Sequence, residues 1–401
     1  MGAVSTGKEP SPATTATCDT ATVLEFLAWG RKKDVDFSND LEQESGPGRA
    51  SHVTNGGTSS TDFLTESTRS VQLDMLEALI PSRDHIVQLV SYHNDSLLWY
   101  HGSYSAKSFS NHLHMFLTDF GGKIRHEQLN LQWLALLFSI LSGSMTCASK
   151  STRHAWGFSD TETPSLSLRW YEATVTCLTM ADYNEVHTIY AVQAIATLTI
   201  SAHILGKSNT QSVLLACAGR VAQSLGLHRL GPETSPANLD QLRKREVGRR
   251  VFIQLCTQDW FQIPFSETYT LNPRFSITAK PLNCNDSDMV VQAQAVPTQS
   301  SYCNFRYDIA ALMPQLLDAT ADCNTPFTKY EQVLKYDAKM RELATASIPT
   351  FLSTNSPVAE EWPSYVSWAR RSLTICAGKY MVTSGVFAYA DTQTAHKIIM
   401  M

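Results

Sequence analysis

The 401-residue sequence contains nine cysteines but no Cys-x-x-Cys pair. The number of cysteines is odd and their spacing is wide, which argues against a secreted disulfide framework and against a compact zinc module. The first twenty residues hold no apolar run of the kind that a signal peptide needs. The most apolar stretches, 133–141 and 189–205, are too short or too rich in polar residues to span about 30 Å of hydrocarbon. We therefore expect an intracellular protein that is not embedded in a membrane.

The sequence also lacks a basic excess. Charged residues make up 17% of the chain, below the roughly 25% of a typical soluble domain, and the formal net charge is −5. A free-standing nucleic-acid binder normally shows strong positive charge, so the balance argues against that class. Apolar residues make up 43%, enough for a sizeable core. The length allows two or three ordinary domains or one large helical domain.

The polarity of the chain changes along its length and predicts five segments. The small polar residues at the start indicate disorder, and Thr22, Glu25 and Gly30 supply start and stop signals for a short helix. The predicted segments are a disordered N-terminus (1–21), a short helix (22–33), a polar linker (34–66), a helical regulatory domain (67–385) and a truncated C-terminal tail (386–401).

Helical periodicity dominates from Leu73 onward, and strand-like alternation is nearly absent. The sequence therefore predicts an all-α fold, a large layered helical bundle. The segment 127–148 is apolar nearly all round, as expected for a helix inside the bundle, and 265–300 is expected to be irregular. The predicted helices are 82–102, 127–148, 165–180, 187–205, 210–225, 242–263, 303–319, 328–346 and 363–380.

Enzyme motifs are present only as incomplete matches. Gly206-Lys207-Ser208 resembles the end of a phosphate-binding loop, but Ser201 occupies the position of the required glycine, so we expect a helix end there. His126-Glu127 lacks the second histidine of a zinc-protease motif, because Asn130 stands at that position. Gly46-Pro47-Gly48 lacks the third glycine of a dinucleotide fingerprint, and no Gly-x-Ser-x-Gly elbow occurs. We therefore assign no catalytic, cofactor-binding, metal-binding or DNA-binding residue, and expect no cofactor.

Four histidines, His93, His101, His112 and His114, fall within 22 residues, with Asp95 and Asp119 nearby. Three imidazoles and a carboxylate can form a metal or acid–base site. His93, however, lies on an apolar helical stripe, where a hydrogen-bonded core histidine is the ordinary explanation. We favour this structural interpretation and keep the metal site as the alternative.

One dense basic run, Arg243-Lys244-Arg245 followed by Arg249-Arg250, opens the segment 242–263. It could form a nuclear localisation signal or a phosphate-contacting surface, but we favour the solvated N-terminal part of an amphipathic helix. Positive charge at a helix N-terminus opposes the helix dipole, which suggests acidic partners in the fold. Asp259 should face inward on the same helix, and we expect it to form a structural ion pair with an arginine such as Arg220.

Several stretches together resemble the regulatory region, or middle homology region, of fungal zinc-cluster transcription factors. The resemblance covers residues 22–385, and no single stretch is diagnostic, but their order and spacing are specific. It implies an all-helical regulatory domain that binds small molecules or proteins. The stretches are Val23–Arg31, Leu79–Phe109, Ala218–Arg229, Arg245–Phe261 and Pro281–Met289.

The sequence departs from this family in one respect. Such factors normally begin with six cysteines that hold two zinc ions, whereas only Cys18 precedes residue 147 here. We therefore expect a nuclear transcription regulator that lacks its own DNA-binding module and controls a secondary-metabolite gene cluster. Its partner would be another transcription factor or coregulator, a second copy of the chain or a small-molecule effector. Two alternatives stay open: a fragment of a complete zinc-cluster activator, and an accessory or enzymatic protein of a biosynthetic pathway.

Overall fold

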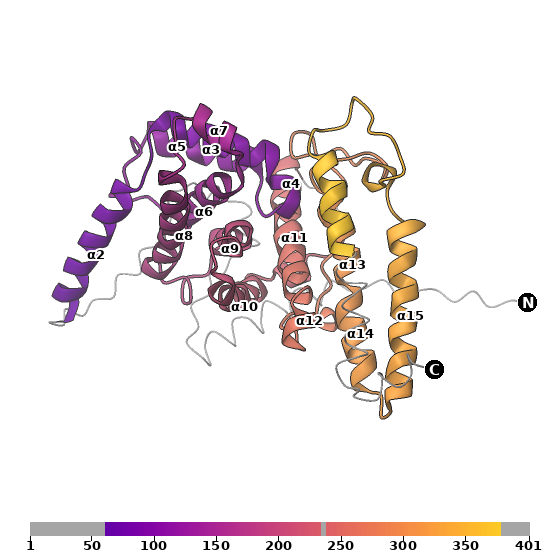
Figure 1. Ribbon diagram of the computed structural model, residues 1–401. Helices are drawn as coiled ribbons and strands as arrows, with labels where there is room; N and C mark the ends of the chain where they lie inside the picture. Colours follow the sequence, from indigo (N-terminus) through magenta and orange to yellow (C-terminus); the bar gives the residue numbers. More distant parts are fainter. Residues whose placement is uncertain (1–60, 234–237, 378–401) are drawn as a thin grey trace, which may run out of the picture.

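The computed structural model describes residues 61–233 and 238–377, and every regular element within these ranges is helical (Figure 1). The all-α class and the layered arrangement predicted from the sequence are therefore confirmed for this part of the chain. The predictions for 1–21, 22–33 and 386–401, and for residues 34–60 of the linker, lie outside the described residues.

Most helices follow one another with short connections, as expected for a layered bundle. Residues 276–300 are a long connection without a helix, within the segment 265–300 that was predicted to be irregular. Those of the first half are α2 (Thr61–Ala78), α3 (Arg83–Ser96), α4 (Leu98–His101), α5 (Ala106–Thr118), α6 (Leu131–Cys147), α7 (Lys150–Ala155), α8 (Glu162–Met180), α9 (Ile189–Ala202) and α10 (Ser208–Ser224). Those of the second half are η1 (Leu227–Arg229), α11 (Leu239–Trp260), α12 (Ile263–Ser266), η2 (Pro273–Phe275), α13 (Ser301–Ala310), α14 (Leu312–Ala321), α15 (Pro326–Thr345), η3 (Thr350–Leu352) and a further helix over 366–377.

Helix α6 forms the centre of the N-terminal half. Its sequence is apolar on all sides, and the side chains of Trp133, Leu137 and Phe138 are fully buried. Asn130 starts the helix, since its side chain accepts hydrogen bonds from the amides of Gln132 and Trp133. Helices α3, α8 and α9 pack around α6. Burying each large apolar side chain contributes about 1.5–3 kcal/mol, so α6 anchors this half.

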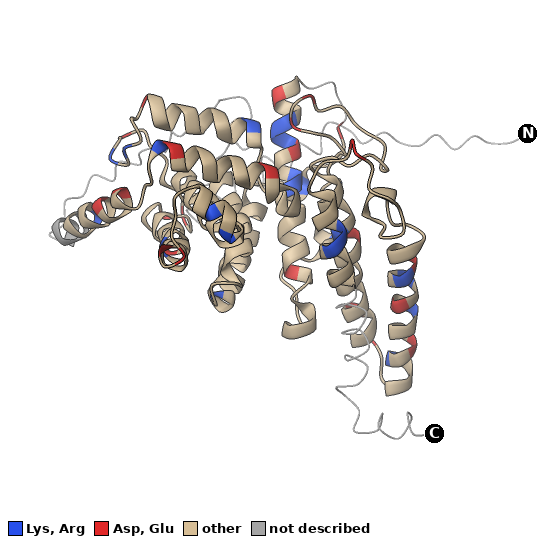
Figure 2. Cartoon of the chain, turned by 45° about the horizontal axis from the view of Figure 1, so that its top comes forward, with Lys and Arg blue, Asp and Glu red and all other residues tan. Residues whose placement is uncertain are grey.

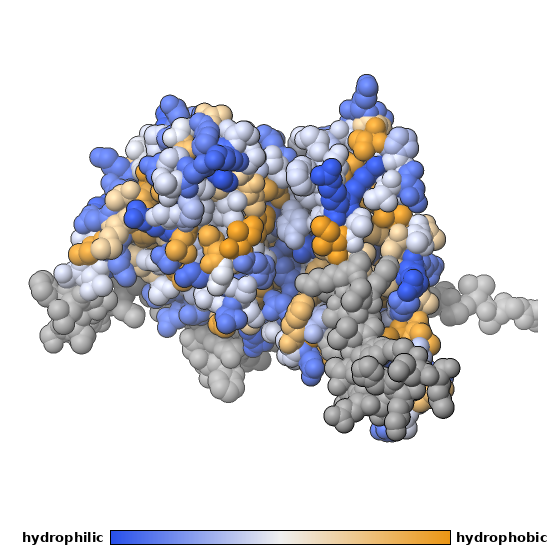
Figure 3. Space-filling model, in the orientation of Figure 1, coloured by the Kyte–Doolittle hydropathy of each residue, from blue (hydrophilic) through white to orange (hydrophobic). Residues whose placement is uncertain are grey.

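Helix α11 joins the two halves of the molecule. It packs on α10 on one side and on α13 on the other, while α14 and α15 pair beyond α13 (Figure 1). The short helix α4 also contacts α13, so the two halves meet a second time at the end of α4. The surface seen in Figure 3 carries several separate apolar patches among polar residues.

Most predicted helix ends lie within four residues of the observed ones, and three predictions differ by more than such a shift. Residues 61–66, assigned to the linker, are the first turns of α2. The helix predicted over 82–102 breaks at Leu97, whose φ of −125° and ψ of −30° are not helical. The helix predicted over 303–319 is two helices, α13 and α14, because the ring of Pro314 would clash with the carbonyl four residues earlier.

Helix α5 was not predicted from the sequence. Its signals are nevertheless present: the Ser105 side chain accepts from the amide of Ser108, and Phe109, Leu113 and Phe116 repeat at helical spacing and are buried. No helix in the part of the chain that the structure describes combines the length and the hydropathy needed to cross a membrane.

Candidate functional site

The structure brings His93 and His101 together, with ring centroids 5.2 Å apart. Both side chains are at most 1% exposed. The Tyr104 hydroxyl donates to Asn94 Oδ1 at 2.8 Å, so His93 Nδ1 donates to that hydroxyl at 2.9 Å. The prediction that His93 is a hydrogen-bonded core histidine is confirmed.

The two rings carry their protons on different nitrogens. The Ser103 amide donates to His101 Nδ1 at 3.1 Å, which places the His101 proton on Nε2, whereas the His93 proton is on Nδ1. Burial lowers the pKa of His93 to about 3. Burial, with the neighbouring His93 and Arg306, also lowers the pKa of His101 well below its ordinary value. Both rings are therefore neutral at physiological pH.

The other members of the cluster are not brought to this pair. His112 lies half-buried on α5 beside Tyr190, and His114 is exposed. The Asp95 carboxylate accepts from Ser91, and the Asp119 carboxylate accepts from Thr118. Within residues 61–233 and 238–377, no three His, Cys, Asp or Glu side chains are placed to hold a metal ion together.

The prediction that the basic run on α11 is solvated is wrong for three of its five residues, whereas Lys244 and Arg245 are partly exposed. Arg243, Arg249 and Arg250 are at most 5% exposed. Figure 2 shows basic and acidic residues alternating along the N-terminal half of this long central helix. The acidic partners that we expected for positive charge at this helix N-terminus are present in the fold. They are needed because a buried charge is costly without a partner of opposite sign.

The three buried arginines bind acidic side chains and a backbone carbonyl, and two of them share Asp286. Arg249 donates to the buried carboxylate of Glu246 and, at 2.6 Å, to Glu233. Arg250 donates to Asp286 at 2.7 Å, and Arg243 donates to the backbone carbonyl of Asp286 at 3.0 Å. Glu246 also accepts from the amide of Leu282 at 2.9 Å, so the network ties α11 to two loops.

The ion pair expected between Asp259 and Arg220 is not formed. The Asp259 carboxylate accepts from the amides of Thr270 and Leu271 at 2.8–3.1 Å, and Arg220 donates to Gln223. Asp259 thus orients the turn after α12. The Gly206 stretch is a helix end as predicted, because Gly206 has a φ of +72° between α9 and α10.

Sequence reasoning did not identify Arg306 on α13, which is 6% exposed. Its guanidinium carbon lies 4.5 Å from the centroid of the Tyr100 ring and 5.3 Å from that of Phe261. Its Nη1 donates to the carbonyl of Tyr100 at 3.3 Å. The only signal in the sequence was an arginine between the aromatic residues Phe305 and Tyr307.

A small pocket of about 50 Å³ lies where α10, α11 and α13 meet the segment 271–278. Phe252, Trp260 and Tyr307 form much of its wall. Drug-sized ligands occupy pockets of about 300–1,000 Å³, so this one has the volume of a few water molecules rather than of an effector.

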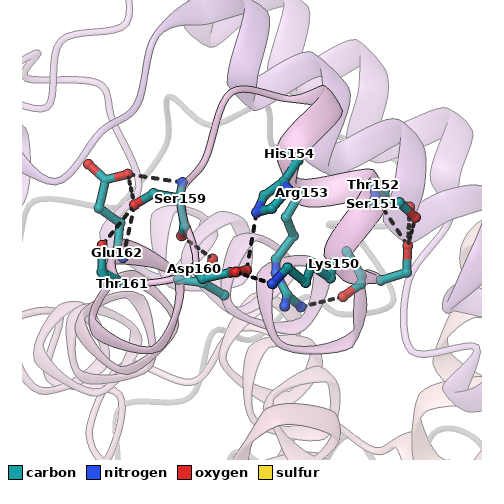
Figure 4. Close-up of polar contacts among 12 residues, drawn as sticks. Lys150, Ser151, Thr152, Arg153, His154, Ser159, Asp160, Thr161 and Glu162 are labelled. Carbon is teal, nitrogen blue, oxygen red and sulfur yellow. Dashed lines mark hydrogen bonds and ion pairs between the residues drawn. The ribbon is translucent and has the colours of Figure 1, made fainter.

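An exposed polar group connects α7 to the start of α8 (Figure 4). Lys150 lies 2.5 Å and His154 lies 3.2 Å from the carboxylate of Asp160. The hydrogen bond from Lys150 is the main cause that lowers the pKa of Asp160. Among the contacts drawn in Figure 4, no serine or threonine hydroxyl bonds to His154. We therefore assign these residues a structural role at the surface, linking α7 to the start of α8.

We expect Asp160→Asn to leave the midpoint of urea unfolding nearly unchanged at pH 7, because water screens an exposed pair. Lys150 and Asp160 are 67% and 44% exposed, respectively. Urea titration followed by circular dichroism measures the effect. A large loss of stability would instead show that the Lys150–Asp160 ion pair holds α7 in place.

Comparisons with known proteins agree with the resemblance drawn from the sequence. No protein-family model matches the chain. The chain is similar to transcription factor TAS2 of Pyricularia oryzae, with 28% identity over 225 residues, 53% of this chain and 29% of that protein. It is also similar to the aurofusarin cluster transcription factor aurR2 of Gibberella zeae, with 27% identity over 157 residues, 37% of this chain and 23% of that protein.

Both relatives are fungal transcription factors, so the predicted similarity to this class of protein is confirmed. The matches span less than a third of the length of either relative. One of the two takes its name from a secondary-metabolite cluster.

Proposed function

We propose that this chain is a nuclear transcription regulator of the fungal zinc-cluster type, in which the helical domain acts by binding rather than by catalysis. The observation that carries the proposal is the similarity to two fungal transcription factors. The name of aurR2 supports a role in the control of a secondary-metabolite gene cluster. The neutral, buried His93–His101 pair supports a structural rather than a catalytic use of the histidines.

We propose further that a partner recognises DNA, since these 401 residues contain no Cys-x-x-Cys pair of the kind that holds the zinc ions in such factors. The helical domain would bind another transcription factor, a coregulator or a second copy of the chain, and an effector would bias that association. The regulated partner, and not this chain, would contact DNA bases.

The first test is tethering. We expect the chain, fused to a heterologous DNA-binding domain, to change expression of a reporter in a filamentous fungus by several-fold, and the tagged chain to accumulate in nuclei. Arg341→Ala, which removes an exposed ion pair, should behave like the wild type. A fusion that is expressed and nuclear but leaves the reporter unchanged would contradict the proposal.

The second test is DNA binding by the purified chain, measured by fluorescence anisotropy at two salt concentrations. We expect no sequence-specific complex, whereas specific readers bind in the range of about 10⁻⁸–10⁻¹¹ M at physiological salt. A nanomolar, sequence-specific and salt-resistant complex would overturn this part of the proposal.

An alternative is that the chain is the regulatory part of a complete zinc-cluster activator, because the matched region covers only 29% and 23% of the two relatives. Sequencing of full-length transcripts distinguishes the two cases. An upstream exon with six closely spaced cysteines would assign DNA recognition to the same polypeptide.

A further inference from the structure

Proline follows a serine or threonine at three places in the described part of the chain, after Thr163, Thr325 and Ser356. Such a pair is the signal by which proline-directed protein kinases recognise the hydroxyl that they phosphorylate. A kinase binds the residues on both sides of that hydroxyl as an extended segment, so a helix that contains them must first unfold there. The three pairs therefore differ in their access to a kinase according to the structure around them.

The hydroxyls of Thr163 and Thr325 are both held at the start of a helix. Thr163 lies in the first turn of α8, is 6% exposed, and donates to the carbonyl of Ser159 at 2.9 Å. The Thr325 side chain accepts from the amide of Thr328 at 3.2 Å and so caps α15, which begins at Pro326. Phosphorylation of either threonine requires the helix end to open, which lowers the fraction of molecules that a kinase can bind.

Ser356 lies instead in a segment without a helix, residues 353–359, which follows η3. It is partly exposed, and Asn355, Pro357 and Val358 beside it are exposed. Its hydroxyl forms no hydrogen bond with any residue that the structure describes. The residue before a proline favours the extended region of backbone space. Ser356 thus has the exposure and the backbone preference that a kinase requires.

Arg370, on the last described helix, is 8% exposed and binds this segment. Its Nη1 donates to the carbonyl of Ser356 itself at 2.6 Å, and its Nε donates to that of Phe351 at 2.8 Å. Its Nη2 makes two long bonds, to the carbonyls of Pro357 at 3.3 Å and Thr350 at 3.5 Å. No carboxylate of the described residues lies within ion-pair distance of Arg370. The carbonyls satisfy its hydrogen bonds, but a buried positive charge without a partner of opposite sign is costly.

We propose that Ser356 is the phosphorylation site of a proline-directed serine/threonine kinase and that Arg370 binds the phosphate. The kinase transfers the γ-phosphoryl group of Mg²⁺-ATP: a bond forms between Ser356 Oγ and the γ-phosphorus, the bond from that phosphorus to the β–γ bridging oxygen breaks, and ADP leaves. The hydroxyl proton passes to the catalytic aspartate of the kinase. The proposal does not depend on the proposed transcriptional function.

The phosphate gives Arg370 the negative partner that it lacks. Phosphoserine carries a charge of about −1.5 to −2 at pH 7, and arginine binds phosphate with two parallel hydrogen bonds. Because Ser356 already bonds to Arg370 through its carbonyl, its side chain is near the guanidinium, and the phosphate replaces the two long bonds of Nη2. The segment 353–359 is then tied more firmly to the helix that follows it.

The first test is phosphorylation of the purified, folded protein by a proline-directed kinase with Mg²⁺-ATP, with the sites located and quantified by mass spectrometry. We expect at least about tenfold faster phosphorylation of Ser356 than of Thr163 or Thr325, because the threonines require a helix end to open. Synthetic peptides that contain each of the three pairs should differ much less. Ser356→Ala should remove the phosphate, and Thr354→Ala, a change at an exposed position in the same segment, should keep it. If Ser356 in the folded protein reacts no faster than the two threonines, the assignment of the site is wrong.

The second test follows the phosphate by phosphorus NMR in the folded protein and in urea. Ser11 and Ser235, which also precede proline, are replaced by alanine, so that Ser356 is the one serine before a proline. We expect the pKa of the phosphate to lie below its ordinary value of about 6 in the folded protein and to return to it in urea, because a guanidinium favours the dianion. The exposed carboxylates of Glu360 and Glu361 nearby in the chain would raise this pKa, so a lowered value reports the arginine.

Two variants assign the effect to one arginine. Arg370→Met should abolish the lowering of the phosphate pKa, and Arg371→Met, at an exposed position of the same helix, should keep it. The comparison of the folded protein with the protein in urea decides the question even if Arg370→Met does not fold. An equal pKa in both states would show that the phosphate binds no arginine, and this part of the proposal would be wrong.

Discussion

Replacing Glu246 by alanine is expected to lower the free energy of unfolding by about 3–5 kcal/mol, because it leaves the buried charge of Arg249 without its nearest partner. Both side chains are 1% exposed. The change also removes the acceptor of the Leu282 amide, which ties the loop to α11. Urea or guanidinium unfolding, followed by circular dichroism, measures the loss.

A double variant separates the charge from the packing. Glu246→Met combined with Arg249→Met removes both buried charges and keeps similar volumes, so it should be more stable than Glu246→Ala. Asp337→Ala on α15 is the control for an ion pair at the surface, where Arg341 is 66% exposed, and it should change stability little. A loss below about 1 kcal/mol for Glu246→Ala, the size usual for surface pairs, would contradict a buried network.

Stability is expected to fall as the pH drops from about 6.5 to 5, by about 2 kcal/mol for His93 at pH 5, with a further loss of the same sign from His101. The pKa of both rings is lowered in the folded protein, to about 3 for His93. Above pH 6.5 both histidines are neutral in the folded and in the unfolded state, so the free energy of unfolding is not reduced by their protonation. Below pH 6.5 the unfolded chain binds protons that the folded chain does not, so proton binding stabilises the unfolded state and the free energy of unfolding falls.

Unfolding curves at pH 7 and pH 5 test this for the wild type, His93→Gln and His101→Gln. Each variant starts less stable, since it loses a buried hydrogen bond, but its stability should depend less on pH. His114→Gln, a change at an exposed position on the neighbouring helix, should keep the wild-type dependence. If all four proteins lose the same free energy between the two pH values, the buried pair is not the cause.

Much of the fold could be predicted because its signals are local. The 17 residues of α6 are apolar on all sides, and this alone predicted an interior helix. The helix predicted over 210–225 stops just before Gly226, which has the φ of +74° that favours glycine at a helix end. The helix predicted over 82–102 begins as expected at residue 82, because the Ser82 side chain accepts from the amide of His85.

The errors occurred where a contact between distant residues decides the outcome. A run of five basic residues in eight positions ordinarily lies in solvent, but Arg249 bonds to Glu233, 16 residues away, and Arg250 bonds to Asp286, 36 residues away. Asp259 has backbone amides within reach and therefore needs no arginine. The spacing of residues along one helix does not predict which distant loop will pack against it.

The sequence by itself determined the helical class, most of the helix boundaries and the interior position of α6, because capping, periodicity and hydrophobicity act within a few turns. The tertiary structure alone decided which charges are buried and which nitrogen of each histidine carries the proton. The Cys303 thiol of α13 donates to the Trp99 carbonyl of α4, although the two residues are 204 positions apart. Burial and electrostatics depend on distance in space, and only the packed chain sets that distance.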